Sequence, residues 1–128
     1  MNQTLLPADG LIAACRNDVP ATELENAPSL RIAAAEIVRE GYLLHYAGEI
    51  GSKPRWYDFD DRDLALLAGD RMYAAGLAAL AEAGDIEAVG VLGSLIAGCA
   101  EAHALAETDR AAELWGSSLA MLAPGPDR

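Results

Sequence analysis

Between residues 29 and 123 the chain contains a single proline, Pro54, and long stretches that are rich in Ala and Leu. Both residues lose little side-chain freedom in a helix, so such stretches favour helix formation. Runs of β-branched residues are few, and apolar and polar residues do not alternate with the period of a strand. The sequence therefore predicts an all-α fold, a bundle of four to five helices.

Helix-breaking and helix-capping residues divide the chain. The predicted helices cover about 29–50, 58–83, 86–107 and 109–122, with Pro28 in the first turn and Gly51 and Gly84 just past two helix ends. Asp85 and Thr108 are the expected caps of the third and fourth helices. We expect one helical domain over residues 1–128, made of a short N-terminal segment (1–27), the bundle (28–122) and a frayed tail (123–128).

Charge and apolar content limit the classes of partner and compartment. The formal net charge is −11, which repels nucleic acid and anionic membrane surfaces. The N-terminus has no signal-peptide pattern, and the most apolar stretch, Ala88 to Ala100, is too short to span a bilayer. Cys15 and Cys99 provide no disulfide framework. We therefore expect a cytoplasmic protein with no nucleic-acid partner and no membrane span.

The third predicted helix is apolar on most of its circumference. Glu87, Ser94 and Glu101 share one narrow polar stripe, and the other positions are apolar or small. This pattern predicts a helix at the centre of the bundle.

Asp70 is the most unusual residue of the second predicted helix. By spacing it falls on the apolar face formed by Leu66, Tyr73, Leu77 and Leu80. Because a lone buried carboxylate is costly, we expect Asp70 to have a polar partner. An ion pair or hydrogen bond within the bundle is the favoured interpretation, and a retained site residue or a contact with another subunit is the alternative.

Two groups of residues have the residue types of a metal site. Helix capping explains the run Asp58, Asp60, Asp61 and Asp63 without a cation. Cys99, His103 and Glu107 share a helix face, but zinc would need a further ligand, so a buried thiol beside a half-buried imidazole is favoured.

His45 and Glu49, four residues apart, are expected to form a surface pair. The chain has no nucleophile elbow, phosphate-binding glycine loop or zincin motif, and we predict no catalytic residue, metal or cofactor.

Part of the chain resembles the trans-isoprenyl diphosphate synthases. The similar residues are Leu43-Leu44-His45, the basic loop with Lys53 and Arg55, and Leu66-Leu67-Ala68-Gly69-Asp70, and the resemblance covers roughly residues 30–106. It implies a partial isoprenoid-synthase-like helical bundle. It also implies Lys53, Arg55 and Asp70 as substrate-binding residues, with Leu66, Tyr73 and Leu77 lining a hydrocarbon tunnel.

The resemblance fails at the family's metal-binding motif. Directly after the histidine the family has Asp-Asp-x-x-Asp, whereas this chain has Tyr46, Ala47, Gly48, Glu49 and Ile50. One glutamate cannot replace three aspartates as magnesium ligands. The chain is thus most similar to the short non-catalytic subunits of that superfamily, which pair with a catalytic prenyltransferase chain and influence product chain length.

Two other functions remain open. The chain could be a general helical interaction module that forms a homodimer. It could also be an enzyme in which Lys53 and Arg55 bind a diphosphate, although basic residues supply no metal ion.

Overall fold

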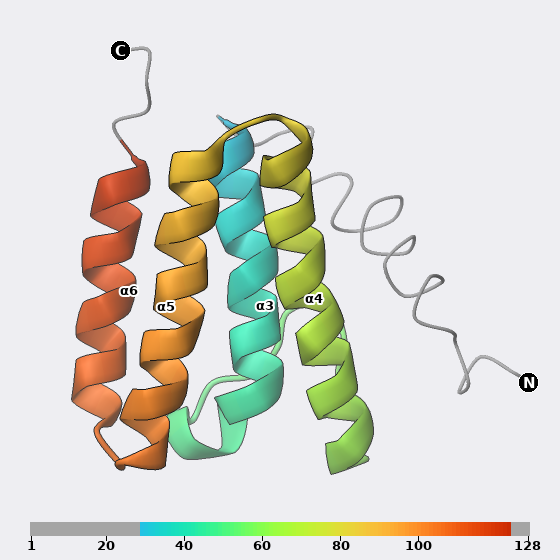
Figure 1. Ribbon diagram of the computed structural model, residues 1–128. Helices are drawn as coiled ribbons and strands as arrows, with labels where there is room; N and C mark the ends of the chain where they lie inside the picture. Colours follow the sequence, from blue (N-terminus) through green and yellow to red (C-terminus); the bar gives the residue numbers. More distant parts are fainter. Residues whose placement is uncertain (1–28, 124–128) are drawn as a thin grey trace, which may run out of the picture.

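Four helices form the part of the chain that the structure describes, residues 29–123. In this computed structural model they are α3 (Leu30–Ile50), α4 (Arg62–Glu82), α5 (Ile86–Ala104) and α6 (Thr108–Leu122), and successive helices run in opposite directions (Figure 1). No strand occurs between residues 29 and 123, so the predicted all-α bundle is confirmed there. The N-terminal segment, Pro28 and residues 124–128 lie outside the described residues.

Helices α3 and α4 end close to the predicted residues, whereas α4 begins at Arg62, four residues after the predicted start, and the cap of α3 is Ser29, which was predicted as a helical residue. The Ser29 side chain accepts a hydrogen bond from the N–H of Ile32, and Gly51 ends α3 with a left-handed φ of 73°. The Asp61 carboxylate accepts from the N–H groups of Asp63 and Leu64 at the start of α4, and so confirms the capping interpretation of the acidic run. Gly84, with φ of 81°, follows α4.

The turn between α5 and α6 differs from the prediction. The third helix ends at Ala104, and Ala106 is left-handed with φ of 60°. Glu107 precedes α6 without a side-chain cap, and Thr108 is the first residue of that helix. The predicted end at Glu107 and the predicted cap at Thr108 were wrong, because this turn contains neither Gly nor Pro and closes through the hydrogen bond from the Glu107 N–H to the Ala102 carbonyl.

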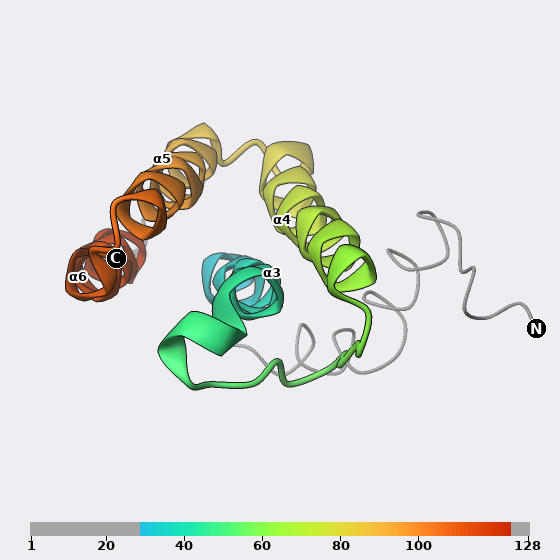
Figure 2. The same ribbon diagram turned by 90° about the horizontal axis from the view of Figure 1, so that it is seen from below.

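The central helix is α3, not α5 as the sequence predicted. Viewed along the helices, α4 and α5 diverge from their connecting turn, and α3 lies between α4 and the α5–α6 pair (Figure 2). Eleven of the 21 residues of α3 are buried, compared with six of the 19 residues of α5. The wide apolar circumference of α5 consists largely of Ala and Gly, and only one stripe of it meets other helices.

Two hydrophobic clusters share α3. The larger joins α3 to α5 and α6, with Leu80 from α4, and its fully buried side chains include Val38, Leu92 and Leu95. The smaller joins α3 to α4 around Met72 and is covered by aromatic side chains of the loop between the two helices (Trp56, Tyr57 and Phe59). Each fully buried Leu or Met contributes about 2–3 kcal/mol through its removal from water.

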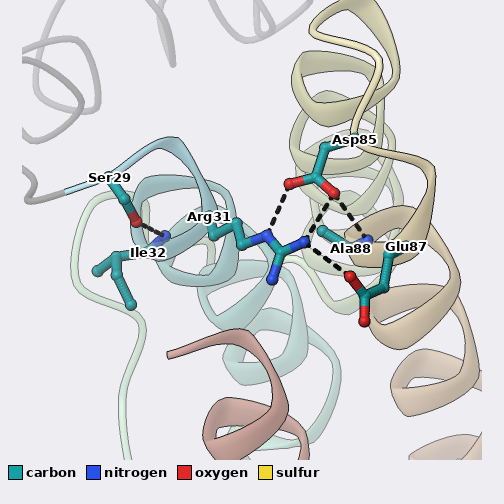
Figure 3. A network of polar contacts seen from close by, with 6 residues as sticks. All are labelled: Ser29, Arg31, Ile32, Asp85, Glu87 and Ala88. Atoms are coloured by element: carbon teal, nitrogen blue, oxygen red, sulfur yellow. Dashed lines mark hydrogen bonds and ion pairs between the residues drawn. The ribbon is translucent and has the colours of Figure 1, made fainter. Parts of the chain in front are cut away.

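The N-terminal end of α3 is tied to the start of α5 by charge. Arg31 donates to both carboxylate oxygens of Asp85, at 2.6 and 2.9 Å, and to Glu87 at 3.2 Å (Figure 3). Asp85 also accepts from the N–H of Ala88, as predicted for the cap of this helix. One aspartate therefore starts α5 and fixes it to α3.

A second polar tie holds the loop between α3 and α4. The carboxylate of Glu40, only 1% exposed, accepts hydrogen bonds from the consecutive backbone N–H groups of Arg55, Trp56 and Tyr57 at 2.7–3.1 Å. These bonds satisfy a charge that would otherwise be costly to bury.

Candidate functional site

The predicted substrate-binding residues lie on opposite sides of α3. The Arg55 guanidinium pairs with Glu36 of α3 and lies over the ring of Trp56, and Lys53 is an exposed residue of the same loop. Asp70 instead approaches α3 at His45, with 3.0 Å between Oδ1 and Nε2. Since Glu36 and His45 are nine residues, or about two and a half helical turns, apart, the loop and Asp70 meet α3 on opposite faces.

Asp70 is not on the buried face of α4, contrary to the prediction. Its side chain is 66% exposed. The face in contact with α3 consists mostly of small residues (Ala65, Ala68, Gly69, Met72, Ala75 and Gly76), whereas Leu66, Tyr73 and Leu77 lie half-buried on its flank. At Gly76 an added methyl group would be only 2.7 Å from Val38 Cγ2, so the small residues bring the helices close together and decide the buried face.

Two of the three segments that carry the family resemblance, the Leu-His segment and the segment Leu66 to Asp70, pack against each other. His45 of the Leu-His segment lies beside Gly69 and Asp70, and a methyl group at position 69 would be 2.3 Å from its Cδ2 atom. The resemblance is therefore located at the contact between α3 and α4.

Next to this contact, three helices bring histidines and tyrosines together in a group that we name the histidine–tyrosine cluster: Tyr42, His45, Tyr46, Tyr73 and His103. The rings of Tyr46 and His103 are stacked, with centroids 3.8 Å apart and planes 9° apart. The His45 ring lies 5.1 Å from Tyr73 and 5.6 Å from Tyr46. Neither Tyr42 nor Tyr46 was predicted as a site residue, although their spacing of four residues placed them on one helix face.

Within this cluster, both nitrogens of His103 have partners. Nδ1 lies 2.6 Å from a carboxylate oxygen of Glu49, and Nε2 lies 2.8 Å from the Tyr42 hydroxyl. Glu49 was expected to pair with His45, but it reaches α5 instead, while His45 meets Asp70 on α4. With both nitrogens engaged and its side chain 2% exposed, His103 has no free atom for a substrate.

Burial also raises the pKa values of the tyrosine hydroxyls of the cluster and of a neighbouring thiol. It raises the pKa of Tyr42 to about 12, and it raises the pKa values of Tyr46 and Tyr73. The thiol of Cys99, buried beside the cluster, has its pKa raised to about 11 by the same cause. All four groups stay protonated at neutral pH, so the arrangement favours rigid packing over nucleophilic or base chemistry.

The residues of the less favoured metal-ligand interpretation, Cys99, His103 and Glu107, do not come together. Cys99 and His103 point into the bundle, but α5 ends at Ala104 and Glu107 pairs with Arg110 on the next helix. Among residues 29–123 no group of three His, Cys, Asp or Glu side chains is placed to hold a metal ion.

Helices α4 and α5 leave much of their apolar sequence unburied. Each helix contains an apolar 18-residue segment, of which only 39% in α4 and 33% in α5 is buried. Leu67 and Ile86 are 54% and 69% exposed on these helices. By length and composition alone both helices could cross a membrane, a property that core helices of soluble proteins share. The apolar segment of α5 is thus longer than the stretch Ala88 to Ala100, on which the expectation of no membrane span was based.

Comparison with protein families, curated proteins and solved structures finds no match to this chain. The relationship to isoprenyl diphosphate synthases therefore stays a prediction from sequence.

Proposed function

We propose that this chain is a non-catalytic helical subunit that binds another helical protein through the outward sides of α4 and α5. The observation that carries the proposal is the low burial of these two apolar helices in the single chain. Apolar surface that stays exposed on two helices is typical of a protein interface or of a membrane contact.

A protein partner explains the charges on this surface better than lipid does. Asp70 and Arg71 lie at the midpoint of α4, which would place them near the centre of a bilayer. A charged residue at that depth costs about 3 kcal/mol. In a protein interface the same side chains can remain at a solvated rim.

The partner class follows from the family resemblance. A larger prenyl diphosphate synthase chain is helical, and it would supply the metal-binding aspartates that are missing after His45. The bound subunit would influence product chain length by its packing against the catalytic chain. Leu66, Tyr73 and Leu77 are half-buried on the flank of α4, and in the complex they would extend a tunnel wall contributed by the partner.

A homodimer is the second candidate. One observation favours it: α4 and α5 each expose a large apolar side chain, Leu67 and Ile86, which a second copy could cover about a two-fold axis.

Co-expression with a candidate synthase tests the proposal. We expect co-purification, and we expect Leu67→Glu and Ile86→Glu to abolish it while Leu119→Glu, at an exposed position of α6, does not. Light scattering of the isolated 13.4-kDa chain identifies the homodimer. A chain that stays monomeric and binds no synthase contradicts both candidates, and turnover of an allylic diphosphate by the isolated chain would instead establish an enzyme.

A further inference from the structure

A cleft of about 450 Å³ lies between α3 and α6, away from the α4–α5 surface. Its walls are aromatic, aliphatic and charged: Arg39, Tyr42, Leu43, Glu49, Ile50, Thr108, Ala112 and Trp115. Clefts of this size commonly hold small organic molecules, with a mainly apolar wall and a few polar groups that orient the ligand.

The polar groups of the cleft are distributed unevenly along α3. Arg39 precedes Tyr42 by one helical turn on the same side of α3, and the Tyr42 ring contacts Trp115 edge-on at 5.5 Å. Glu49 lies ten residues after Arg39, about 15 Å further along the axis. One end therefore combines a guanidinium with an indole, and the other end carries the carboxylate.

Two donors at the first end have no partner in the described part of the chain. Arg39 is exposed and forms no ion pair there, although the chain has 20 acidic residues. The Nε1 atom of Trp115 is buried and has no hydrogen-bond partner there either. The carboxylate at the opposite end is already engaged by His103. Because Trp115 Nε1 is closed to solvent, the donor that the cleft offers to a ligand is the Arg39 guanidinium, beside a flat aromatic wall.

We propose that this cleft binds a small, flat aromatic acid, with its ring system against Trp115 and its anionic group on Arg39. Aromatic rings are favoured beside Trp and Tyr faces, and an anion gains a charge-assisted hydrogen bond from guanidinium. The overall charge of −11 does not oppose this binding strongly at physiological salt, because charges more than about 8 Å away are screened. The site is independent of the proposed subunit function.

A pair of probes that differ by one anionic group tests the proposal. In a Trp56→Phe background, where Trp115 is the remaining tryptophan, 1-anilinonaphthalene-8-sulfonate should bind with one-to-one stoichiometry and quench Trp115. Arg39→Gln should raise its dissociation constant roughly three- to fivefold, the effect of an exposed charge pair, and Arg39→Lys should raise it less. The uncharged N-phenyl-1-naphthylamine should bind Arg39→Gln and the parent equally.

A steric variant tests the location. Ala112→Phe fills the cleft and should weaken both probes, whereas Ala120→Phe, also exposed on α6 but outside the cleft, should weaken neither. The proposal is overturned if the folded protein binds neither probe, or if Arg39→Gln and Ala112→Phe leave binding of the sulfonate unchanged. Loss of sulfonate binding in Leu67→Glu alone would place the probe on the α4–α5 surface instead.

Discussion

His45 lies so close to Gly69 that no larger residue fits between α3 and α4 at this level. A Cβ atom at position 69 would be 2.3 Å from the imidazole Cδ2 and 2.9 Å from the backbone carbonyl oxygen of Gly41. The imidazole could turn aside, but the carbonyl belongs to the backbone of the central helix. The separation of the two helices is therefore set by a glycine.

Gly69→Ala should destabilise the protein, although alanine is the better helix former. Overpacking against α3 costs about 1–3 kcal/mol, which exceeds the gain in helix propensity of about 1 kcal/mol. Gly90→Ala is the matched control, because nothing lies within 4 Å of a methyl group there, and it should stabilise the protein by about 0.5–1 kcal/mol. Chemical denaturation measures both. Equal stabilisation by the two substitutions would show that the close approach does not exist.

The buried tyrosines should make the protein sensitive to alkali. The pKa of Tyr42 is raised to about 12 from an unfolded value near 10, so the stabilisation that it provides is complete below about pH 10 and is lost as the pH rises towards 12. Tyr46 and Tyr73 are shifted in the same direction. Absorbance at 295 nm should therefore report ionisation of these phenols together with loss of the helical circular dichroism signal.

Tyr42→Phe separates the hydrogen bond from this titration. At neutral pH the variant should lose about 1 kcal/mol, because His103 Nε2 loses its partner. Between pH 10 and 12 the difference from the parent should shrink, since the parent then has to ionise a buried phenol. Phenols that titrate near pH 10 in a fully helical protein would contradict this account.

Asp85 combines a helix cap with an ion pair, and two substitutions separate them. Asp85→Asn keeps a capping side chain but removes the charge that Arg31 binds, so its melting temperature should fall between those of the parent and Asp85→Ala. The hydrogen bonds from Arg31 lower the pKa of Asp85. Its stabilisation is therefore present above the unfolded pKa near 3.9 and is lost as the pH falls through the folded value.

The advantage of the parent over Asp85→Asn should accordingly be visible at pH 7 and vanish in strong acid. Glu82→Gln, which removes a charge from the exposed last residue of α4, serves as the charge control and should change the melting temperature little. If Asp85→Asn had the same melting temperature as the parent at every pH, the ion pair would contribute nothing to stability.

The helix ends that local chemistry determines could be predicted from the sequence. Gly51 and Gly84 act through their backbone angles and Asp61 acts through its side chain, and each is where the sequence indicated. The residues of the α5–α6 turn were predicted wrongly because Ala106 takes a left-handed conformation, which is not expected for alanine.

The positions of the site residues depend on contacts that no single helix reveals. Asp70 was assigned to a buried face because leucines usually lie on the buried face of a helix. In the structure α3 approaches α4 closely at Gly69 and Gly76, so the face of α4 that is rich in alanine is the buried one. His103 was selected for its spacing from Cys99, but its partners Tyr42 and Glu49 lie more than 50 residues earlier in the chain. Such pairings arise only when α3 and α5 pack.

The buried carboxylate of Glu40 gives the loop after α3 an unusual property for a segment without regular secondary structure. Three successive backbone amides, from Arg55 to Tyr57, donate hydrogen bonds to this one side chain. If the loop moved away, the buried carboxylate would lose these hydrogen bonds. The lifetime of the loop conformation is therefore tied to that of the central helix. The amide protons of Arg55, Trp56 and Tyr57 should exchange with solvent as slowly as those of α3, so that this part of the connection behaves kinetically as part of the core.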